Sequence, residues 1–182
     1  MQRQLIQPYL FALVILGIAL TTSACFNEPN YPDKPEIVGS TVFPYKNLPA
    51  RAGVGRGRRD SIVVTINFRD GDGNLGNDTP VPSADSARYF SNGGWGNYKI
   101  TTLRLNNGKY EVLPTPVNRT LYFPDLAKNK PKGAIEGTLD FNQTFLYGNS
   151  SRLTPIKFQV QIRDRTLNES NVIETDTVWV PL

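Results

Sequence analysis

Four oxygen-bearing side chains lie close together in the stretch FRDGDGNLGND, residues 68–78. Asp70, Asp72 and Asn74 stand at alternate positions, and Asp78 follows four residues later. Calcium takes about six to eight oxygen ligands, and loops supply them from alternate residues while intervening glycines permit a tight backbone path. The residue types and their spacing therefore predict a calcium site, with Asp70, Asp72, Asn74 and Asp78 as its candidate ligands.

A turn without a metal explains the same residues in another way. The pattern departs from an EF-hand, because Leu75 stands where that loop needs glycine and Val81 where it needs a bidentate glutamate. Aspartate and asparagine side chains accept backbone N–H bonds in turns, and glycine adopts positive φ angles there. The stretch is therefore also compatible with a simple strand-ending turn.

A fifth candidate ligand lies far along the chain. Asp164 ends the alternating stretch PIKFQVQIRD, as Asp70 ends SIVVTINFRD. If both stretches are strands of one sandwich, their following loops can emerge at the same end. We then expect Asp164 beside Asp70 and Asp72, where crowded carboxylates require a cation or a basic partner. The adjacent arginines, Arg69, Arg163 and Arg165, are the alternative to a metal.

The composition argues against most catalytic chemistry. The chain has no histidine and one cysteine, which excludes Ser-His and Cys-His nucleophilic machinery and most zinc sites. A hydrolase that uses only carboxylates remains as an alternative, but no spacing pairs the glutamates at 111, 136, 169 and 174. We therefore expect a protein that is not an enzyme.

The N-terminus has the features of an export signal. One basic residue, an apolar run and small residues precede Cys25, and the run is short for a membrane span. The ending TTSAC resembles the lipobox of bacterial lipoproteins, although Thr22 replaces the usual leucine. It implies a signal peptide at 1–24 and lipidation of Cys25. Cleavage after Ala24 without lipidation and an uncleaved anchor helix are the alternatives.

The remaining chain predicts an all-β domain. Residues 25–57 carry the lipidated end and several prolines and acids, which favours a flexible tether. Residues 58–182 hold about seven stretches with the two-residue period of strands, and Asn107-Gly108 suits a hairpin turn. No sustained helical period is present. This pattern is typical of an antiparallel, immunoglobulin-like β-sandwich of about seven strands.

One long interval interrupts the strands. Residues 76–94 carry no alternation and lead into NGGWGNY, which holds Trp95 and Tyr98. An aromatic ring on a glycine-rich loop could stack on a sugar, which makes Trp95 and Tyr98 candidate ligand-binding residues. The alternative is that Trp95 is buried beneath the loop, because an exposed tryptophan leaves apolar area uncovered.

The combination of DSIVVTINFRDGDGNLG, IEGTL and IKFQVQIRDRTLNESNVIETDTVWV resembles a group of lipoproteins common in Bacteroidetes, whose activity is not established. The resemblance implies an exported protein held by lipid in the outer membrane, on its periplasmic or its outer face. Proteins of that phylum are O-glycosylated at Asp-Ser/Thr-apolar motifs, which makes Ser86 the candidate acceptor.

Two functions fit these expectations. The first is a non-catalytic envelope module that binds a protein partner or a polymer, with calcium as its only candidate cofactor. The alternative is a carbohydrate-binding surface lipoprotein that uses Trp95 and the 76–94 loop. Binding of nucleic acid is not expected, because the arginine-rich stretch at 51–60 has no interleaved aromatics for base stacking.

Overall fold

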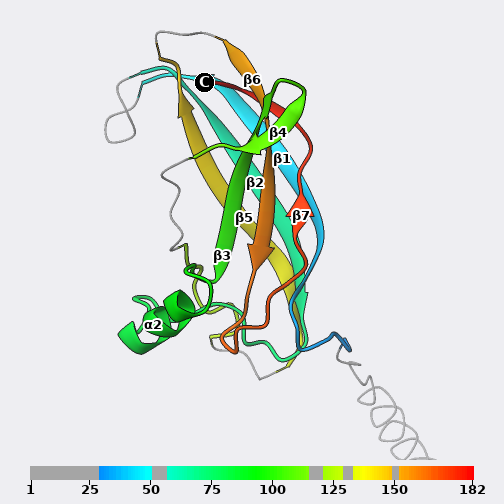
Figure 1. Ribbon diagram of the computed structural model, residues 1–182. Helices are drawn as coiled ribbons and strands as arrows, with labels where there is room; N and C mark the ends of the chain where they lie inside the picture. The colour runs from blue at the N-terminus through cyan, green and yellow to red at the C-terminus, as the bar shows by residue number, and fades with distance from the viewer. Residues whose placement is uncertain (1–28, 51–56, 115–120, 129–132, 149–151) are drawn as a thin grey trace, which may run out of the picture.

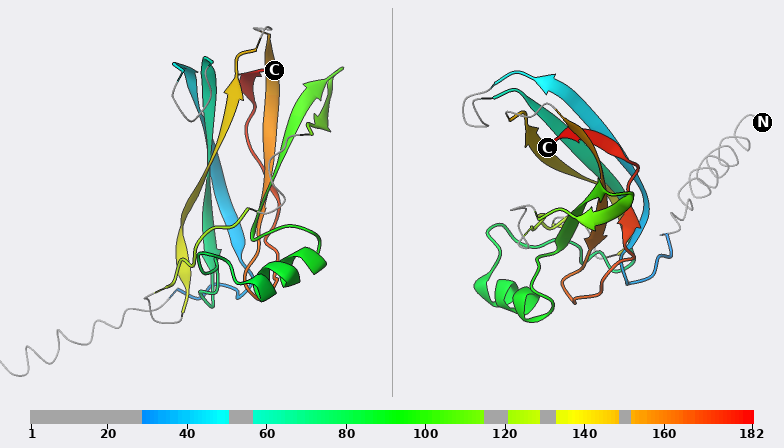
Figure 2. Two further views of the ribbon diagram at one scale, coloured as in Figure 1. Left: turned by 90° about the vertical axis from the view of Figure 1, so that its left-hand side faces the viewer. Right: turned by 45° about the horizontal axis from the view of Figure 1, so that its top comes forward.

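Two antiparallel sheets form the domain in the computed structural model, which describes residues 29–50, 57–114, 121–128, 133–148 and 152–182. Figure 1 shows the strands running along one long axis, and Figure 2 shows the two sheets facing each other. The expected all-β sandwich is confirmed. None of the helices in the described ranges is long and apolar enough to cross a membrane.

The first sheet has the strand order β1-β2-β5, formed by Glu36–Leu48, Arg59–Asp70 and Ile135–Leu146. The second has the order β4-β3-β6-β7, formed by Lys109–Val112, Tyr98–Asn106, Leu153–Ile162 and Ile173–Glu174. The last strand, β8 at Val178–Pro181, pairs with the beginning of β6. Because β7 and β8 follow each other along β6, they act as one interrupted strand, and the order is that of an immunoglobulin-like sandwich.

The core lies between the sheets and comes from the predicted alternation. In β2 the side chains of Ile62, Val64 and Ile66 are fully buried, and β6 buries every second residue from Ile156 to Ile162. The intervening residues of both strands are more exposed, as the pleat of a half-buried strand requires. The predicted hairpin is also present, with Asn107 and Gly108 at positive φ between β3 and β4.

The predicted flexible tether at 25–57 is wrong over residues 36–48, because β1 occupies Glu36–Leu48 and pairs with β2 along most of its length. This strand lies at the edge of its sheet and leaves Phe43 and Tyr45 at least half exposed, so its sequence shows little alternation. Pro44 is tolerated because an edge strand has one unpaired side. The sandwich therefore begins well before residue 58.

The interval at 76–94 is also more ordered than predicted. It contains the helix α2, Ser83–Ser91, which buries only Tyr89. A helix of nine residues with one buried side chain produces no sustained apolar period, which explains why the sequence did not reveal it. In Figures 1 and 2, α2 lies at one end of the sandwich, beside the loops that follow β2 and β6.

Asn171 links the edge strand β1 to the second sheet. Its side-chain oxygen accepts from the N–H of Ile37 at 2.8 Å, and its side-chain nitrogen donates to the carbonyl of Ile37 at 3.0 Å. We expect Asn171→Ala to lower the free energy of unfolding by about 1–3 kcal/mol, because both backbone groups of Ile37 lose a partner. Urea unfolding of the variant measures this loss.

Asn106→Ala is the matched control, because the Asn106 amide bonds only the exposed Glu111 at 3.0 Å. We expect a change within about 0.5 kcal/mol for this variant. An equally small change for Asn171→Ala would show that β1 is held by its pairing with β2 alone.

Candidate cation site

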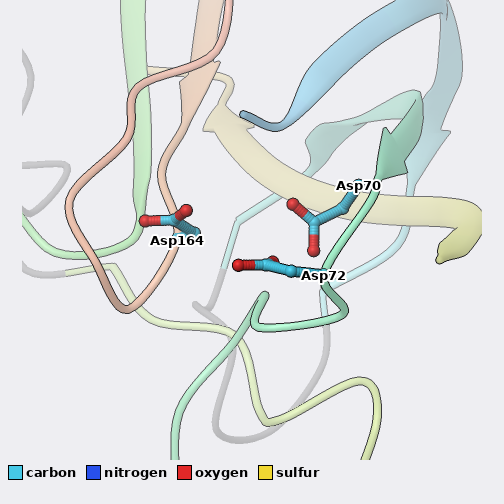
Figure 3. A group of neighbouring side chains, drawn as sticks. All are labelled: Asp70, Asp72 and Asp164. Atoms are coloured by element: carbon cyan, nitrogen blue, oxygen red, sulfur yellow. The ribbon is translucent and has the colours of Figure 1, made fainter. Parts of the chain in front are cut away.

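Three carboxylates meet at the end of the sandwich where β2 and β6 finish. Asp70 is the last residue of β2, Asp72 follows in the turn, and Asp164 comes two residues after β6. One carboxylate oxygen from each lies within 4.8 Å of the other two. Figure 3 shows the side chains of Asp70 and Asp72 directed toward the loop after β6, and the carboxylate of Asp164 turned into that loop. The sequence-based expectation that Asp164 lies beside Asp70 and Asp72 agrees with this geometry.

Asp70 is the carboxylate with the greatest electrostatic cost. Its side chain is fully buried, and its Oδ1 has no hydrogen-bond partner among the described residues. Burial, then the charges of Asp72 and Asp164, raise the pKa of Asp70 from 3.8 to about 7. A buried carboxylate with an open oxygen and two acidic neighbours is stabilised by a proton or by a metal cation.

Asn74 closes the turn around the first two carboxylates. Its backbone N–H donates to Asp70 Oδ2 at 3.1 Å and to Asp72 Oδ1 at 3.2 Å, and its Nδ2 donates to Asp72 Oδ2 at 2.6 Å. These bonds are the ones that a strand-ending turn requires. They leave the Oδ1 of Asn74 buried without a partner, as they leave Asp70 Oδ1. The turn explains part of the arrangement and leaves two buried oxygens unsatisfied.

Asp164 is held in place by its own loop. Its carboxylate accepts from Thr166 Oγ1 at 2.9 and 3.0 Å, from the N–H of Asn168 at 2.8 Å and from Asn168 Nδ2 at 2.8 Å. Sequence reasoning did not single out Thr166, nor Asn168 as a partner of the Asp164 carboxylate. The spacing Asp-x-Thr-x-Asn is the available signal, because aspartate bonds backbone and side-chain groups a few residues ahead in such turns.

The basic side chains that could neutralise the cluster are bound elsewhere. Arg69 lies 3.5 Å from Glu136 and over the ring of Tyr31 at 5.1 Å. Arg165 forms a 2.7 Å ion pair with Asp125. Both guanidinium groups are therefore engaged with other partners.

Arg163 is turned to the opposite side of the loop from Asp164. Its guanidinium group donates to the carbonyls of Tyr89, Asn92, Trp95 and Gly96. It also lies over the rings of Tyr89 and Trp95, at 4.8 and 4.1 Å from their centroids. Its nearest carboxylate is that of Glu169, at 4.0 Å. None of the three arginines named as alternatives to a metal forms an ion pair with the cluster in the described structure.

Asp78 is separate from the other candidate ligands. Its side chain is 62% exposed and lies 3.6 Å from the ammonium group of Lys128. It is not part of the group formed by Asp70, Asp72 and Asp164. The predicted ligands therefore do not all come together. Asp78 forms a solvated ion pair, whereas Asn74 lies beside the cluster.

The N-terminal segment docks on the turn that carries the cluster. The N–H of Gly71 donates to the carbonyl of Pro32 at 2.9 Å. A Cβ atom at position 71 would lie 2.2 Å from the carbonyl oxygen of Tyr31, so only glycine fits between Asp70 and Asp72. The chain therefore enters the sandwich at the same end as the carboxylates.

The other candidate residues lie outside this cluster. Trp95 is 4% exposed beneath Arg163, and Tyr98 is 5% exposed and stacks on Phe141 between the sheets. Neither ring presents an open face to solvent. Ser86 lies within α2 and accepts a 3.5 Å bond from Tyr122. Cys25 lies outside the described residues.

The donor set matches a hard cation. Asp70, Asp72, Asp164 and Asn74 supply carboxylate and amide oxygens from two loops, without a nitrogen or sulfur ligand among them. Calcium prefers such oxygens and tolerates irregular geometry, whereas magnesium demands an octahedron and retains several waters. Water would supply the remaining ligands of a calcium ion bound there.

Comparison of the chain with protein-family models, with curated proteins and with solved structures finds no match.

The raised pKa of Asp70 predicts a specific pH dependence in the presence of a chelator. Between pH 4 and 7 the folded state binds more protons than the unfolded state, because its Asp70 carboxyl titrates at about 7. The stabilising effect of this proton is complete below about pH 4 and is lost as the pH rises through 7. We expect the free energy of unfolding to fall between about pH 4 and 7 and to level off above pH 7, and Asp70→Asn to remove that part of the decline.

Urea unfolding at several pH values, with EDTA present, measures this dependence. Asp78→Asn is the control, because the exposed Asp78 lies outside the cluster and its loss should leave the slope unchanged. An undiminished slope in Asp70→Asn would contradict the assignment of the titration to Asp70.

Proposed function

We propose that the chain is a non-catalytic β-sandwich module of the cell envelope, held by a lipid on Cys25, whose loop end binds calcium. The observation that carries the calcium proposal is the buried, unpartnered oxygen of Asp70, whose carboxylate clusters with those of Asp72 and Asp164 without an ion pair to a described arginine. The lipobox-like TTSAC and the apolar run before it support the export and anchoring.

The arrangement of the acids supports a binding role over hydrolysis. Four of the five described glutamates lie in separate contacts, Glu111 with Asn106, Glu136 with Tyr31, Glu169 with Gln161 and Glu174 with Lys157, and the fifth, Glu36, begins β1. The carboxylates of the cation site do not line the groove of about 610 Å³ on the second sheet. Calcium in such a place fixes loops, because it joins the ends of β2 and β6 across the two sheets.

Calcium should stabilise the folded protein. A ligand at a hundred times its dissociation constant adds about 2.7 kcal/mol, which raises the melting temperature of a domain of this size by about 5–10 °C. We expect that rise for the wild-type chain in millimolar calcium against EDTA, and a smaller rise in magnesium. Differential scanning calorimetry measures both.

Asp70→Asn and Asp164→Asn should abolish the calcium-dependent rise, because each removes a carboxylate of the cluster. Asp78→Asn is the matched control and should retain the rise, since Asp78 pairs with Lys128 outside the cluster. An unchanged melting temperature of the wild type in calcium, or an equal rise in Asp70→Asn, would refute the calcium site.

The lipid anchor makes a separate prediction. We expect the chain produced in a bacterial host to incorporate an alkyne analogue of palmitate and to remain with the membrane fraction. Cys25→Ser should lose the label, because lipid is transferred to the cysteine thiol. Ser86→Ala is the control and should keep it. Equal labelling of Cys25→Ser would show that Cys25 is not the acceptor.

A further inference from the structure

A groove of about 610 Å³ runs along the second sheet, away from the carboxylates. Its floor is the first half of β3, residues 99–102, and its two ends are formed by residues 93–95 and 112–114. None of the proposed calcium ligands lines it. An inference about this groove therefore goes beyond the proposed function and does not require the cation.

The strand pairing leaves room for the groove. On one side β3 pairs with β6 from Tyr98 to Arg104, but on the other it pairs with β4 only from Leu103 onward. In the described chain, two backbone hydrogen bonds engage the edge of β3 that β4 does not cover. The N–H of Leu113 donates to the carbonyl of Thr102 at 2.8 Å, and the N–H of Tyr98 donates to the carbonyl of Leu121 at 3.2 Å. The groove lies along the strand edge between the two points.

Residues 93–95 form the wall at one end of the groove, and Arg163 holds this wall in place. Arg163 holds the carbonyls of Asn92, Trp95 and Gly96 and covers the Trp95 ring at 4.1 Å. Gly94, with a φ of +70°, faces open space where a side chain would otherwise project. The wall thus keeps its shape without a ligand, which lowers the entropic cost of binding.

The charge of the groove is positive. Lys99 is the only charged residue in its described lining, and its ammonium group forms no ion pair with a described residue. That group lies 5.5 Å from the Trp95 ring centroid, at the junction of floor and wall. Thr101 adds a hydroxyl group, whereas the buried hydroxyl of Thr102 donates to Gln143 Oε1 at 3.3 Å, and Ile100 and Leu113 add apolar surface.

We propose that this groove binds an acidic saccharide, with the sugar carboxylate on Lys99. An unpaired ammonium group favours an anion, the Thr101 hydroxyl can bond a sugar hydroxyl, and the apolar lining can cover the hydrophobic face of a pyranose ring. The volume accommodates one or two sugar rings, which is within the usual range of small-ligand sites. The ammonium group of Lys99 and the mixed polar and apolar lining thus determine the class of ligand.

The test uses a trimer of galacturonic acid as the probe and the full chain in detergent. The chain has two tryptophans, so in a Trp179→Phe background Trp95 alone reports binding through its fluorescence. We expect a saturable change with the acidic trimer, and little change with a neutral galactose trimer of the same length. Inorganic phosphate is the third arm, and competition by phosphate at equal concentration would indicate an anion site without sugar specificity and overturn the saccharide proposal.

Lys99→Gln should weaken binding of the acidic trimer at least tenfold, because it removes the charge while Lys99 is exposed enough for glutamine to fit. Thr101→Glu should abolish binding, since it places a like charge in the groove. Lys109→Gln is the matched control, because Lys109 lies on β4 and does not line the groove. Equal affinity of Lys99→Gln and wild type, equal binding of the neutral trimer, or no saturable change would each overturn the proposal.

Discussion

The burial of the Asp70 carboxylate at the end of β2 is the constraint on which the functional end of the sandwich depends. The same position that completes the central strand of the first sheet brings Asp70 to within a few ångströms of Asp164 from the second sheet. The sandwich therefore draws like charges together, and the nearby arginines are occupied in other contacts. A proton at low pH and a calcium ion at neutral pH are two ways to relieve this charge, and only the metal also joins the loops.

The two residues that follow β6, Arg163 and Asp164, contact different parts of the molecule. Arg163 points toward α2 and donates to carbonyls of the 89–96 segment, while the carboxylate of Asp164 is held by its own loop and lies near Asp70 and Asp72. Because successive side chains of an extended chain leave on opposite sides, one dipeptide contributes to both the wall of the groove and the carboxylate cluster. A change in backbone position at this dipeptide would therefore be felt at both places.

Sequence reasoning succeeded where burial imposes a regular period and failed where it does not. The alternation of β2 and β6 predicted the sandwich, and the matching aspartates at their ends predicted the carboxylate cluster. The edge strand β1 was missed because its outward face keeps Phe43 and Tyr45 exposed, and α2 because it buries only Tyr89. The cover of Arg163 over Trp95 joins residues 68 positions apart, so only the tertiary structure reveals it.

The two ends of the described chain lie at opposite ends of the sandwich, so a pulling force between them would act along the strands. The described chain enters beside the Asp70 turn, where Glu36 pairs with Arg69, and Leu182 leaves at the opposite end, where its N–H bonds Arg152. Tension between a tethered N-terminus and a partner held near the C-terminus would pull β1 lengthwise along β2. The hydrogen bonds of that ladder would then resist together in shear, whereas strands peeled sideways lose them one by one.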